Sequence, residues 1–209
     1  MCGRFYIADE DETGEIQRMI EEAARKQKAI LGCDTVARGE VAPGMTAAAL
    51  ALGKTGKRGV FPMEWGFSLE KKRIINTRLE TADELPLFQS AFQTRRCLLP
   101  MTHYFEWENR EEMIPSLLDG TGWEPVGKRR TRYAIRPKGQ GMMYLAGIYR
   151  YESKKKLPVF SVLTCPPDES IAWLHDRMPV ILGEQTAMDF LCRAEAVECR
   201  EKAMVFRAG

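Results

Sequence analysis

Most apolar positions in this chain fall in short runs or alternate with polar ones, and a helical period is found in only a few stretches. Short runs between turn residues are typical of strands. They predict strands at residues 2–8, 47–52, 59–67, 97–99, 103–108, 132–136, 142–151, 158–164 and 180–182. Apolar side chains at helical spacing predict helices at residues 11–30, 87–95, 170–174, 184–192 and 195–204.

Many short strands with few helices predict an α+β fold. We expect a curled, partly barrel-like antiparallel sheet with flanking helices. Residues 111–132 mix proline, glycine and both signs of charge, and are expected to form a surface excursion between two strands. Because no internal repeat or low-complexity linker interrupts the sequence, residues 1–209 are expected to form a single domain.

The composition is that of an ordinary globular protein, with 44% hydrophobic and 29% charged residues. The net charge of +2 does not by itself indicate nucleic acid, so any anion-binding surface must be local. No apolar run is long enough to cross a bilayer, and the amino terminus lacks the pattern of a signal peptide. We therefore expect a cytoplasmic protein that does not contact a membrane.

The six cysteines are scattered without a CxxC pair, so they are expected to be reduced and mostly buried. Cys97 and Cys165 fit core positions on strands. A zinc site usually takes ligands in close pairs, and the chain has only two histidines. We expect no metal and no cofactor.

Cys2 is the most informative residue, because initiator methionine is normally removed ahead of a residue as small as cysteine. The mature chain would then begin with a thiol and a free α-amine on neighbouring carbons. The amine titrates at about 7.7–8.0 and the thiol at about 8.5, so a fraction of each is reactive at neutral pH. Such a pair condenses with aldehydes to a thiazolidine, or attacks acyl groups with its amine as base. The alternative is a small residue without a chemical role.

Two polar residues stand beside apolar segments. Asn76 follows an apolar pair at a predicted strand end, where functional side chains are common, although a turn or helix cap fits equally. Glu106 lies between aromatic residues, and desolvation there tends to raise a carboxyl pKa and suits general acid–base catalysis. A solvated strand face is the alternative, because Glu108 follows on the same side.

His175 precedes the tetrapeptide Asp-Arg-Met-Pro and is the best candidate for proton transfer near neutral pH. An ordinary loop pairing with Asp176 is the alternative. The other histidine, His103, fits a packed or exposed strand residue better than a catalyst.

Arginines and flat side chains accompany these segments. Arg4, Arg78 and Arg177 stand close in sequence to the candidate catalytic residues, and arginine near a nucleophile suits phosphate recognition. Pro43 and Trp65 could offer flat apolar surfaces to bases, although core packing explains the tryptophan equally well.

Eight segments in this order resemble the SOS response-associated peptidase (SRAP) family, also called abasic site processing proteins. They are residues 1–5 (MCGRF), 42–44 (APG), 65–66 (WG), 76–81 (NTRLET), 95–100 (RRCLLP), 105–107 (FEW), 145–149 (LAGIY) and 175–182 (HDRMPVIL). Together they span nearly the whole chain.

The resemblance implies a DNA-damage enzyme that binds single-stranded DNA at an abasic site and forms a covalent thiazolidine through the mature Cys2. It implies that Asn76 positions the amine, that Glu106 moves protons, and that His175 assists opening of the deoxyribose ring and reversal of the link.

The resemblance also assigns Arg4, Arg78 and Arg177 to the DNA backbone. It further implies self-removal of the residues ahead of Cys2, a monomer, and nucleoid association within the SOS response. The chemistry of the imine adds a possible abasic-site lyase activity. The chain departs from the family pattern at Glu64, where an arginine is common, and in residues 111–128, which are longer than the usual connection.

Two other functions stay open at the level of sequence. Glutamine amidotransferases with an N-terminal nucleophile also begin with Met-Cys-Gly, although their downstream glutamine-binding pattern is not found here. A noncatalytic binder of single-stranded nucleic acid would bind intact and abasic strands equally and with strong salt dependence.

Overall fold

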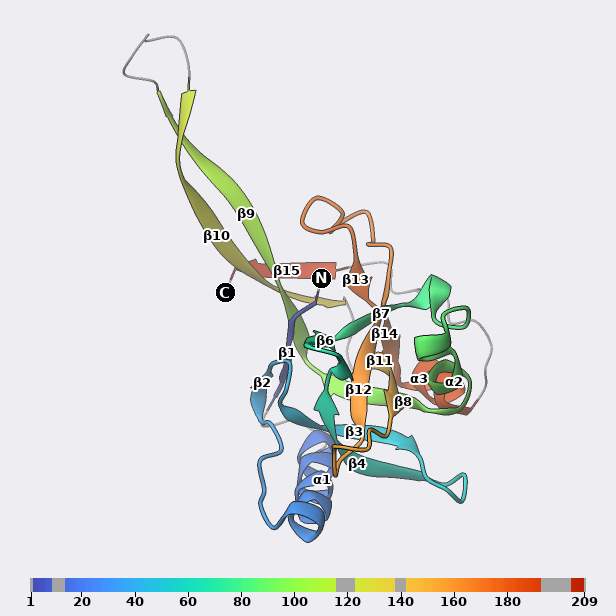
Figure 1. Cartoon of the computed structure of the whole chain (residues 1–209). Coiled ribbons are helices and arrows are strands. Elements are labelled where there is room, and N and C mark those ends of the chain that lie inside the picture. The colour runs from blue at the N-terminus through green and yellow to red at the C-terminus, as the bar shows by residue number, and fades with distance from the viewer. Residues whose placement is uncertain (1, 9–13, 116–122, 138–141, 193–203, 209) are drawn as a thin grey trace.

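The computed structural model describes residues 2–8, 14–115, 123–137, 142–192 and 204–208. Its largest sheet has the strand order β13 (Met178–Pro179), β12 (Val159–Cys165), β4 (Arg58–Trp65), β3 (Thr46–Leu52), β8 (Arg96–Met101), β11 (Met143–Arg150) and β14 (Ile181–Gly183). Because β12 pairs with β11 as well as β4, the strands β12, β4, β3, β8 and β11 close into a ring (Figure 1). This ring confirms the predicted α+β fold with a partly barrel-like sheet.

The sheet is mixed and not antiparallel throughout. β12 runs parallel to β4 and also to β7 (Asn76–Arg78). Gly147 on β11 lies where β8, β11 and β12 come together: a Cβ atom there would meet Cys97 Sγ at 3.1 Å and Ser161 O at 3.2 Å. The close approach of three strands therefore explains the glycine in the segment LAGIY.

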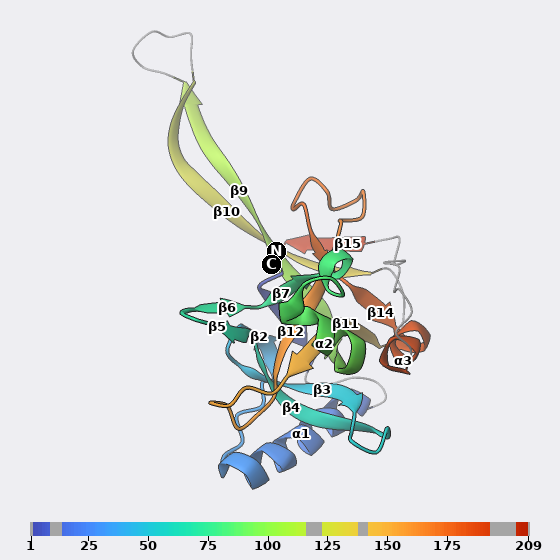
Figure 2. The same cartoon turned by 45° about the vertical axis from the view of Figure 1, so that its right-hand side comes forward.

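A second sheet has the order β15 (Met204–Ala208), β10 (Trp123–Pro137), β9 (His103–Pro115), β1 (Arg4–Ile7) and β2 (Gly39–Val41). The far part of the β9–β10 hairpin extends away from the rest of the molecule (Figures 1 and 2). A small hairpin of β5 (Phe67–Leu69) and β6 (Lys72–Ile74) stands apart from both sheets.

The helices cover the ring from two sides. α1 (Glu15–Leu31) packs on β3 and β4 through its apolar face and ends at Gly32, whose φ of 78° favours glycine. α2 (Pro86–Thr94) and α3 (Glu184–Cys192) pack on β8 and β11, and a short 3₁₀ turn, η1 (Leu79–Thr81), follows β7. None of the helices in the described residues is long and apolar enough to cross a membrane.

The sequence prediction was wrong for residues 111–132. Those that the structure describes belong to the hairpin, in which β9 and β10 pair from Ile135 with Tyr104 to Trp123 with Pro115. In the middle of this ribbon, at residues 108–112 and 127–131, polar and charged side chains occupy both faces, so no apolar alternation marks the strands there.

The predicted helices were only partly correct. Residues 170–174 form hydrogen-bonded turns and not a helix, with the Asp168 carboxylate accepting a hydrogen bond from Ser170 N at 2.9 Å. The helix predicted at 195–204 lies outside the described residues except for Met204, which begins β15. The helix predicted at 11–30 is α1, and residues 11–13 fall outside the described part.

Candidate active site

Cys2 lies beside the strand that carries Glu106. β1 runs antiparallel to β9 with Arg4 opposite Phe105, so the residues ahead of Arg4 run alongside Glu106 and Trp107 toward the hairpin. The Cys2 side chain is completely buried, and its Sγ donates a weak hydrogen bond to the Arg4 carbonyl at 3.6 Å. The beginning of the chain is thus held inside the fold.

Asn76 reaches Cys2 from the other sheet. β7 is held in place by its parallel pairing with β12, where Asn76 lies opposite Val162. The Asn76 Nδ2 group donates a hydrogen bond to the Cys2 carbonyl at 2.9 Å. Its Oδ1 atom is buried and accepts no hydrogen bond from the described residues. One buried amide oxygen therefore stays available beside the backbone of Cys2.

Glu106 is buried, with 6% of its surface exposed, and Oε1 accepts a hydrogen bond from Trp107 N at 3.2 Å. Burial and, to a smaller extent, the negative charge of Glu106 together raise the pKa of the Cys2 thiol to about 12. The thiol consequently keeps its proton at neutral pH. Cys2, Asn76 and Glu106, which are far apart in the sequence, come together in one place.

His175 lies on the loop between β12 and β13. Its Nδ1 atom is 3.0 Å from Arg177 N and 2.6 Å from Asp176 Oδ1. A neutral ring accepts a hydrogen bond from the backbone amide through Nδ1, and a protonated ring donates to the carboxylate, so these two contacts belong to different protonation states. The hydrogen bonds of the ring thus stay within its own loop.

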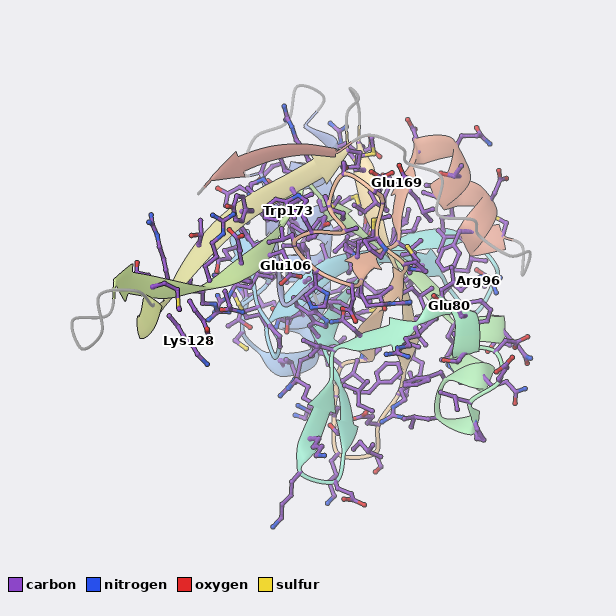
Figure 3. All side chains as sticks on the ribbon, turned by 90° about the horizontal axis from the view of Figure 1, so that it is seen from above. Glu80, Arg96, Glu106, Lys128, Glu169 and Trp173 are labelled. Atoms are coloured by element: carbon purple, nitrogen blue, oxygen red, sulfur yellow. The ribbon has the colours of Figure 1, made fainter. Side chains whose placement is uncertain are left out.

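The His175 loop is fixed to the body at two points. The Arg177 guanidinium donates to both Glu80 carboxylate oxygens at 2.6 and 2.7 Å and to the Thr164 carbonyl at 2.6 Å. The Trp173 ring meets Tyr133 edge-on with centroids 5.3 Å apart, and Tyr133 is the residue opposite Glu106 in the hairpin. Figure 3 shows Trp173 and Glu106 near each other in the view from above. The loop that carries His175 therefore contacts the hairpin at the residue opposite Glu106.

The structure corrects the expectation that Trp65 stacks on bases. Trp65 is completely buried, with its ring 5.3 Å from Phe5 and 5.9 Å from Phe160. Its Nε1 group donates to the Ile75 carbonyl at 2.9 Å, so this tryptophan supports the backbone just before Asn76. A ring enclosed by the core cannot present a face to a ligand.

Gly66, the partner of Trp65 in the sequence motif, has a φ of 114°, which favours glycine. A Cβ atom there would lie 2.2 Å from Cγ of Arg73, so the glycine also makes room for that side chain. Arg73 and Lys155 both pair with Glu64, at 2.7 and 2.8 Å. The negative charge that departs from the family pattern is therefore neutralised by neighbouring cations.

The remaining predicted DNA contacts differ in how far their side chains are exposed and in whether they are already paired. Pro43 and Arg78 are exposed. The Arg4 side chain is 44% exposed and pairs with Glu40 at 2.5 Å. By contrast, the Arg177 side chain is only 12% exposed, and its guanidinium is engaged by Glu80 and the Thr164 carbonyl.

Sequence reasoning missed several residues of this region, which are Glu40, Glu80, Arg132, Tyr133 and Trp173. Only Glu80 carried a signal, because it lies in the segment NTRLET. Glu40, Arg132 and Tyr133 depend on strand pairing across long sequence distances, and Trp173 depends on its ring contact with Tyr133. Within the described ranges, no group of three or more His, Cys, Asp or Glu residues is arranged to hold a metal ion.

Comparison with known proteins places the chain in a family. A family model described as SOS response associated peptidase (SRAP) matches residues 1–207. The abasic site processing protein YedK of Escherichia coli K12 is 25% identical over 197 residues, covering 91% of this chain and 79% of that protein. YMR114C of Saccharomyces cerevisiae, also named an abasic site processing protein, is 32% identical over 114 residues. This segment covers 54% of this chain and 27% of the yeast protein.

The abasic site processing protein YoqW of Bacillus subtilis is 26% identical over 122 residues, covering 57% of this chain and 48% of that protein. The chain thus matches only about a quarter to a half of the length of the yeast and Bacillus relatives. Among solved structures, a protein from Bacteroides thetaiotaomicron has the same fold, with a TM-score of 0.66, 18% identity, and coverage of 99% of this chain and 91% of that one. Because the family model matches almost every residue, this chain belongs to the SOS response associated peptidase (SRAP) family.

Proposed function

We propose that this chain processes abasic sites in single-stranded DNA and bonds to them through the mature amino-terminal Cys2. Membership of the family and the printed names of the relatives support this function. The observation that carries it is the meeting of three groups. Asn76 Nδ2 donates a hydrogen bond of 2.9 Å to the Cys2 carbonyl, and the charge of the buried Glu106 raises the pKa of the Cys2 thiol.

The crosslink forms in two bond-making steps. Once residue 1 is removed, the Cys2 amine attacks C1′ of the ring-opened sugar, and the resulting carbinolamine loses water to give an imine. The thiol sulfur then bonds to the same carbon while its proton passes to the nitrogen, which closes the thiazolidine. The balance is one water released for each crosslink. The five-membered ring hydrolyses far more slowly than the imine.

The high pKa of the thiol sets the order of these steps. A thiol whose pKa is raised to about 12 is a poor first nucleophile at neutral pH, whereas an amine with a pKa of about 8 is partly neutral there. The amine therefore attacks first, and the thiol reacts only with the more electrophilic imine.

Each buried polar group has a separate task. The free Oδ1 of Asn76 accepts a hydrogen bond from the new amine and orients it. Glu106 takes a proton from the attacking nitrogen, delivers it to the departing hydroxyl, and later accepts the thiol proton. His175 assists opening of the sugar ring and reversal of the link from the loop that contacts Tyr133, the residue opposite Glu106.

The DNA backbone and bases lie against exposed side chains near Cys2. Arg4 and Arg78 bind phosphates, and Pro43 contacts a base. We assign Arg177 to holding the His175 loop, because Glu80 already occupies its guanidinium. The protein acts as a monomer in the cytoplasm, on DNA of the nucleoid, during the SOS response.

The same groups support two further activities. Attack of the Cys2 thiol on the preceding carbonyl breaks the peptide bond and leaves a thioester, which water then hydrolyses to release the residue ahead of Cys2. From the imine, loss of a C2′ proton expels the 3′ phosphate and forms a carbon–carbon double bond. This second route is the β-elimination of an abasic-site lyase.

The proposed function is tested with a single-stranded oligonucleotide from which one uracil has been excised. The wild-type protein is expected to give a slowly migrating adduct on denaturing electrophoresis, and Cys2→Ala is expected to give none. Cys33→Ala, which removes an exposed cysteine, is the matched control and should leave the adduct intact. A wild-type protein without an adduct, or an undiminished adduct from Cys2→Ala, refutes the proposal.

A further inference from the structure

The β9–β10 hairpin has two faces of different charge. In an antiparallel pair, residues opposite each other share a face, and successive residues alternate between faces. Arg132 lies opposite Trp107, Arg130 opposite Asn109, and Lys128 opposite Glu111. We call the face with these residues the outer face; Glu106 and Tyr133 share the opposite, inner face.

The outer face carries most of the positive charge. Among the described side chains of residues 107–113 and 127–136, it holds four cations and one carboxylate, which are Lys128, Arg130, Arg132, Arg136 and Glu111. The inner face of the same segments holds two of each, which are Arg110, Arg129, Glu108 and Glu112. The hairpin is thus nearly neutral on one side and basic on the other.

The outer cations are regularly spaced along one strand. Lys128, Arg130 and Arg132 occupy alternate positions of β10, so their backbone positions are about 6.8 Å apart. Lys128, Arg130 and Arg136 are exposed, and Arg132 is a third exposed on its side chain while bonded to Glu40. A row of cations at this separation fits the successive phosphates of an extended single strand.

Aromatic rings lie beneath the arginines. The Arg130 guanidinium lies over the Trp107 ring at 4.7 Å from its centroid, and that of Arg132 lies over the Phe105 ring at 3.4 Å. Guanidinium planes held flat on aromatic rings are themselves surfaces on which bases stack. A protein partner needs no such repeated combination of cation and flat surface, whereas single-stranded nucleic acid uses both.

β1 adds one more cation to the outer face, close to Cys2. Arg4 lies opposite Phe105 on this face, and the chain ahead of Arg4 runs toward the tip of the hairpin (Figure 1). Cys2 is two residues from Arg4, so a strand bonded to the Cys2 amine leaves the site near the foot of the row of cations. This continuity is absent from the β5–β6 hairpin, which lies apart from the hairpin of β9 and β10 (Figure 2).

We propose that the outer face of the β9–β10 hairpin is a second nucleic-acid contact, which holds the backbone of the single strand on one side of the abasic site. This inference rests on the proposed function for where the DNA strand starts. The contact between the outer face and the DNA does not depend on the proposed function.

The test compares two double variants of equal charge. Lys128→Gln with Arg130→Gln removes two cations from the outer face, and Arg110→Gln with Arg129→Gln removes two from the inner face of the same ribbon. Binding of an undamaged, fluorescent oligothymidylate is measured by anisotropy at several salt concentrations. Thermal unfolding of both variants establishes that the hairpin is intact.

The outer variant is expected to bind about 25-fold more weakly at 0.1 M salt, because two lost phosphate contacts lower the log–log salt slope by about 1.4. The inner variant is expected to bind as the wild type does. Equal affinities of the two variants, whether both weakened or both unchanged, overturn the inference, as does a defect seen with duplex but not with single strands. The readout requires no abasic site, so a wild-type protein that binds the oligothymidylate but forms no adduct refutes the proposed function alone.

Discussion

Cys2 is a buried residue whose sulfur and nitrogen differ in reactivity for a physical reason. Removal of the thiol from water and the nearby charge of Glu106 both disfavour the thiolate, so its pKa rises to about 12. Cys33, by contrast, is exposed to solvent. Burial thus protects the thiol from oxidation and alkylation until an imine forms beside it.

The first prediction follows from the sign of the Glu106 effect. Glu106 raises the pKa of the Cys2 thiol, so Glu106→Gln lowers it and increases the thiolate fraction at pH 9. Alkylation of Cys2 by iodoacetamide should become faster, by about tenfold for each unit of pKa. Peptide mapping by mass spectrometry measures the rate for each cysteine.

The other cysteines are internal controls for that experiment. Cys33 and Cys192 are exposed and should be alkylated first in both proteins. Cys97, whose pKa is raised by burial alone, should stay slow in both. An unchanged or slower rate at Cys2 in Glu106→Gln would mean that the carboxylate does not act on the thiol.

At the residue scale, the sequence predicted which polar residues lie together better than it predicted the packing of apolar ones. Cys2, Asn76 and Glu106 were recognised from residue types and motifs, and the structure brings them together. The role of Trp65 could not be predicted, because its burial depends on Phe160, which is distant in the sequence. A flat apolar side chain fits a core and a stacking surface equally well until its neighbours are known.

At the element scale, an ion pair is one of the two attachments that hold the loop between β12 and β13 in position. Arg177 spans the gap between this loop and Glu80, which follows β7. The same short stretch of chain holds His175 and Trp173, so loss of the pair should disturb both. The loop is thereby connected to the strand that carries Asn76.

The second prediction concerns Glu80→Gln, which removes the charge and keeps the shape. Because the Glu80 side chain is 44% exposed, stability should fall by only about 1 kcal/mol, while crosslink formation slows several-fold through misplacement of His175. Glu84→Gln, an exposed change nearby, is the control.

A double-mutant cycle separates positioning from a general loss of stability. If Glu80 acts through His175, His175→Ala should slow the reaction less in the Glu80→Gln protein than in the wild type. Fully additive effects on the rate would show that the ion pair has no connection with the histidine.

Elements were predicted well where one face is buried and poorly where neither is. The pattern at residues 184–192 predicted α3 with its correct bounds, because α3 packs one apolar face on β8, β11 and β14. The hairpin could not be predicted from residues 111–132, since paired charges on two exposed faces leave no hydrophobic period. Its existence depends on pairing between Trp107 and Arg132, which no local pattern indicates.

At the scale of the whole molecule, the closed ring of strands buries Cys97 beside Gly147. Burial raises the pKa of this thiol far above its ordinary value of 9.0. The sequence predicted that Cys97 is buried, but the closure of the ring depends on the parallel pairing of β12 with β4, which alternation alone does not reveal.

The third prediction is a dependence of stability on alkaline pH. Below pH 9 the Cys97 thiol is protonated in both the folded and the unfolded chain, so it adds no pH dependence. Above pH 9 only the unfolded chain ionises, so this residue destabilises the wild type by about 1.4 kcal/mol per pH unit.

Urea unfolding of the wild type and Cys97→Ala from pH 7 to 10.5 measures this effect. The difference in unfolding free energy between the two proteins should be constant up to about pH 9 and then shrink. A difference that stays constant over the whole range would contradict the buried, protonated state of Cys97.

The most direct test of the account is the intact mass of the wild-type protein after reaction with an abasic oligonucleotide, with and without borohydride. The account predicts a chain that begins at Cys2, joined to the oligonucleotide with loss of one water, and a mass that borohydride leaves unchanged. An adduct on a chain that retains Met1 would contradict the joint action of sulfur and nitrogen. An adduct whose mass rises by two hydrogen atoms with borohydride would also contradict it, because that adduct was an imine before reduction.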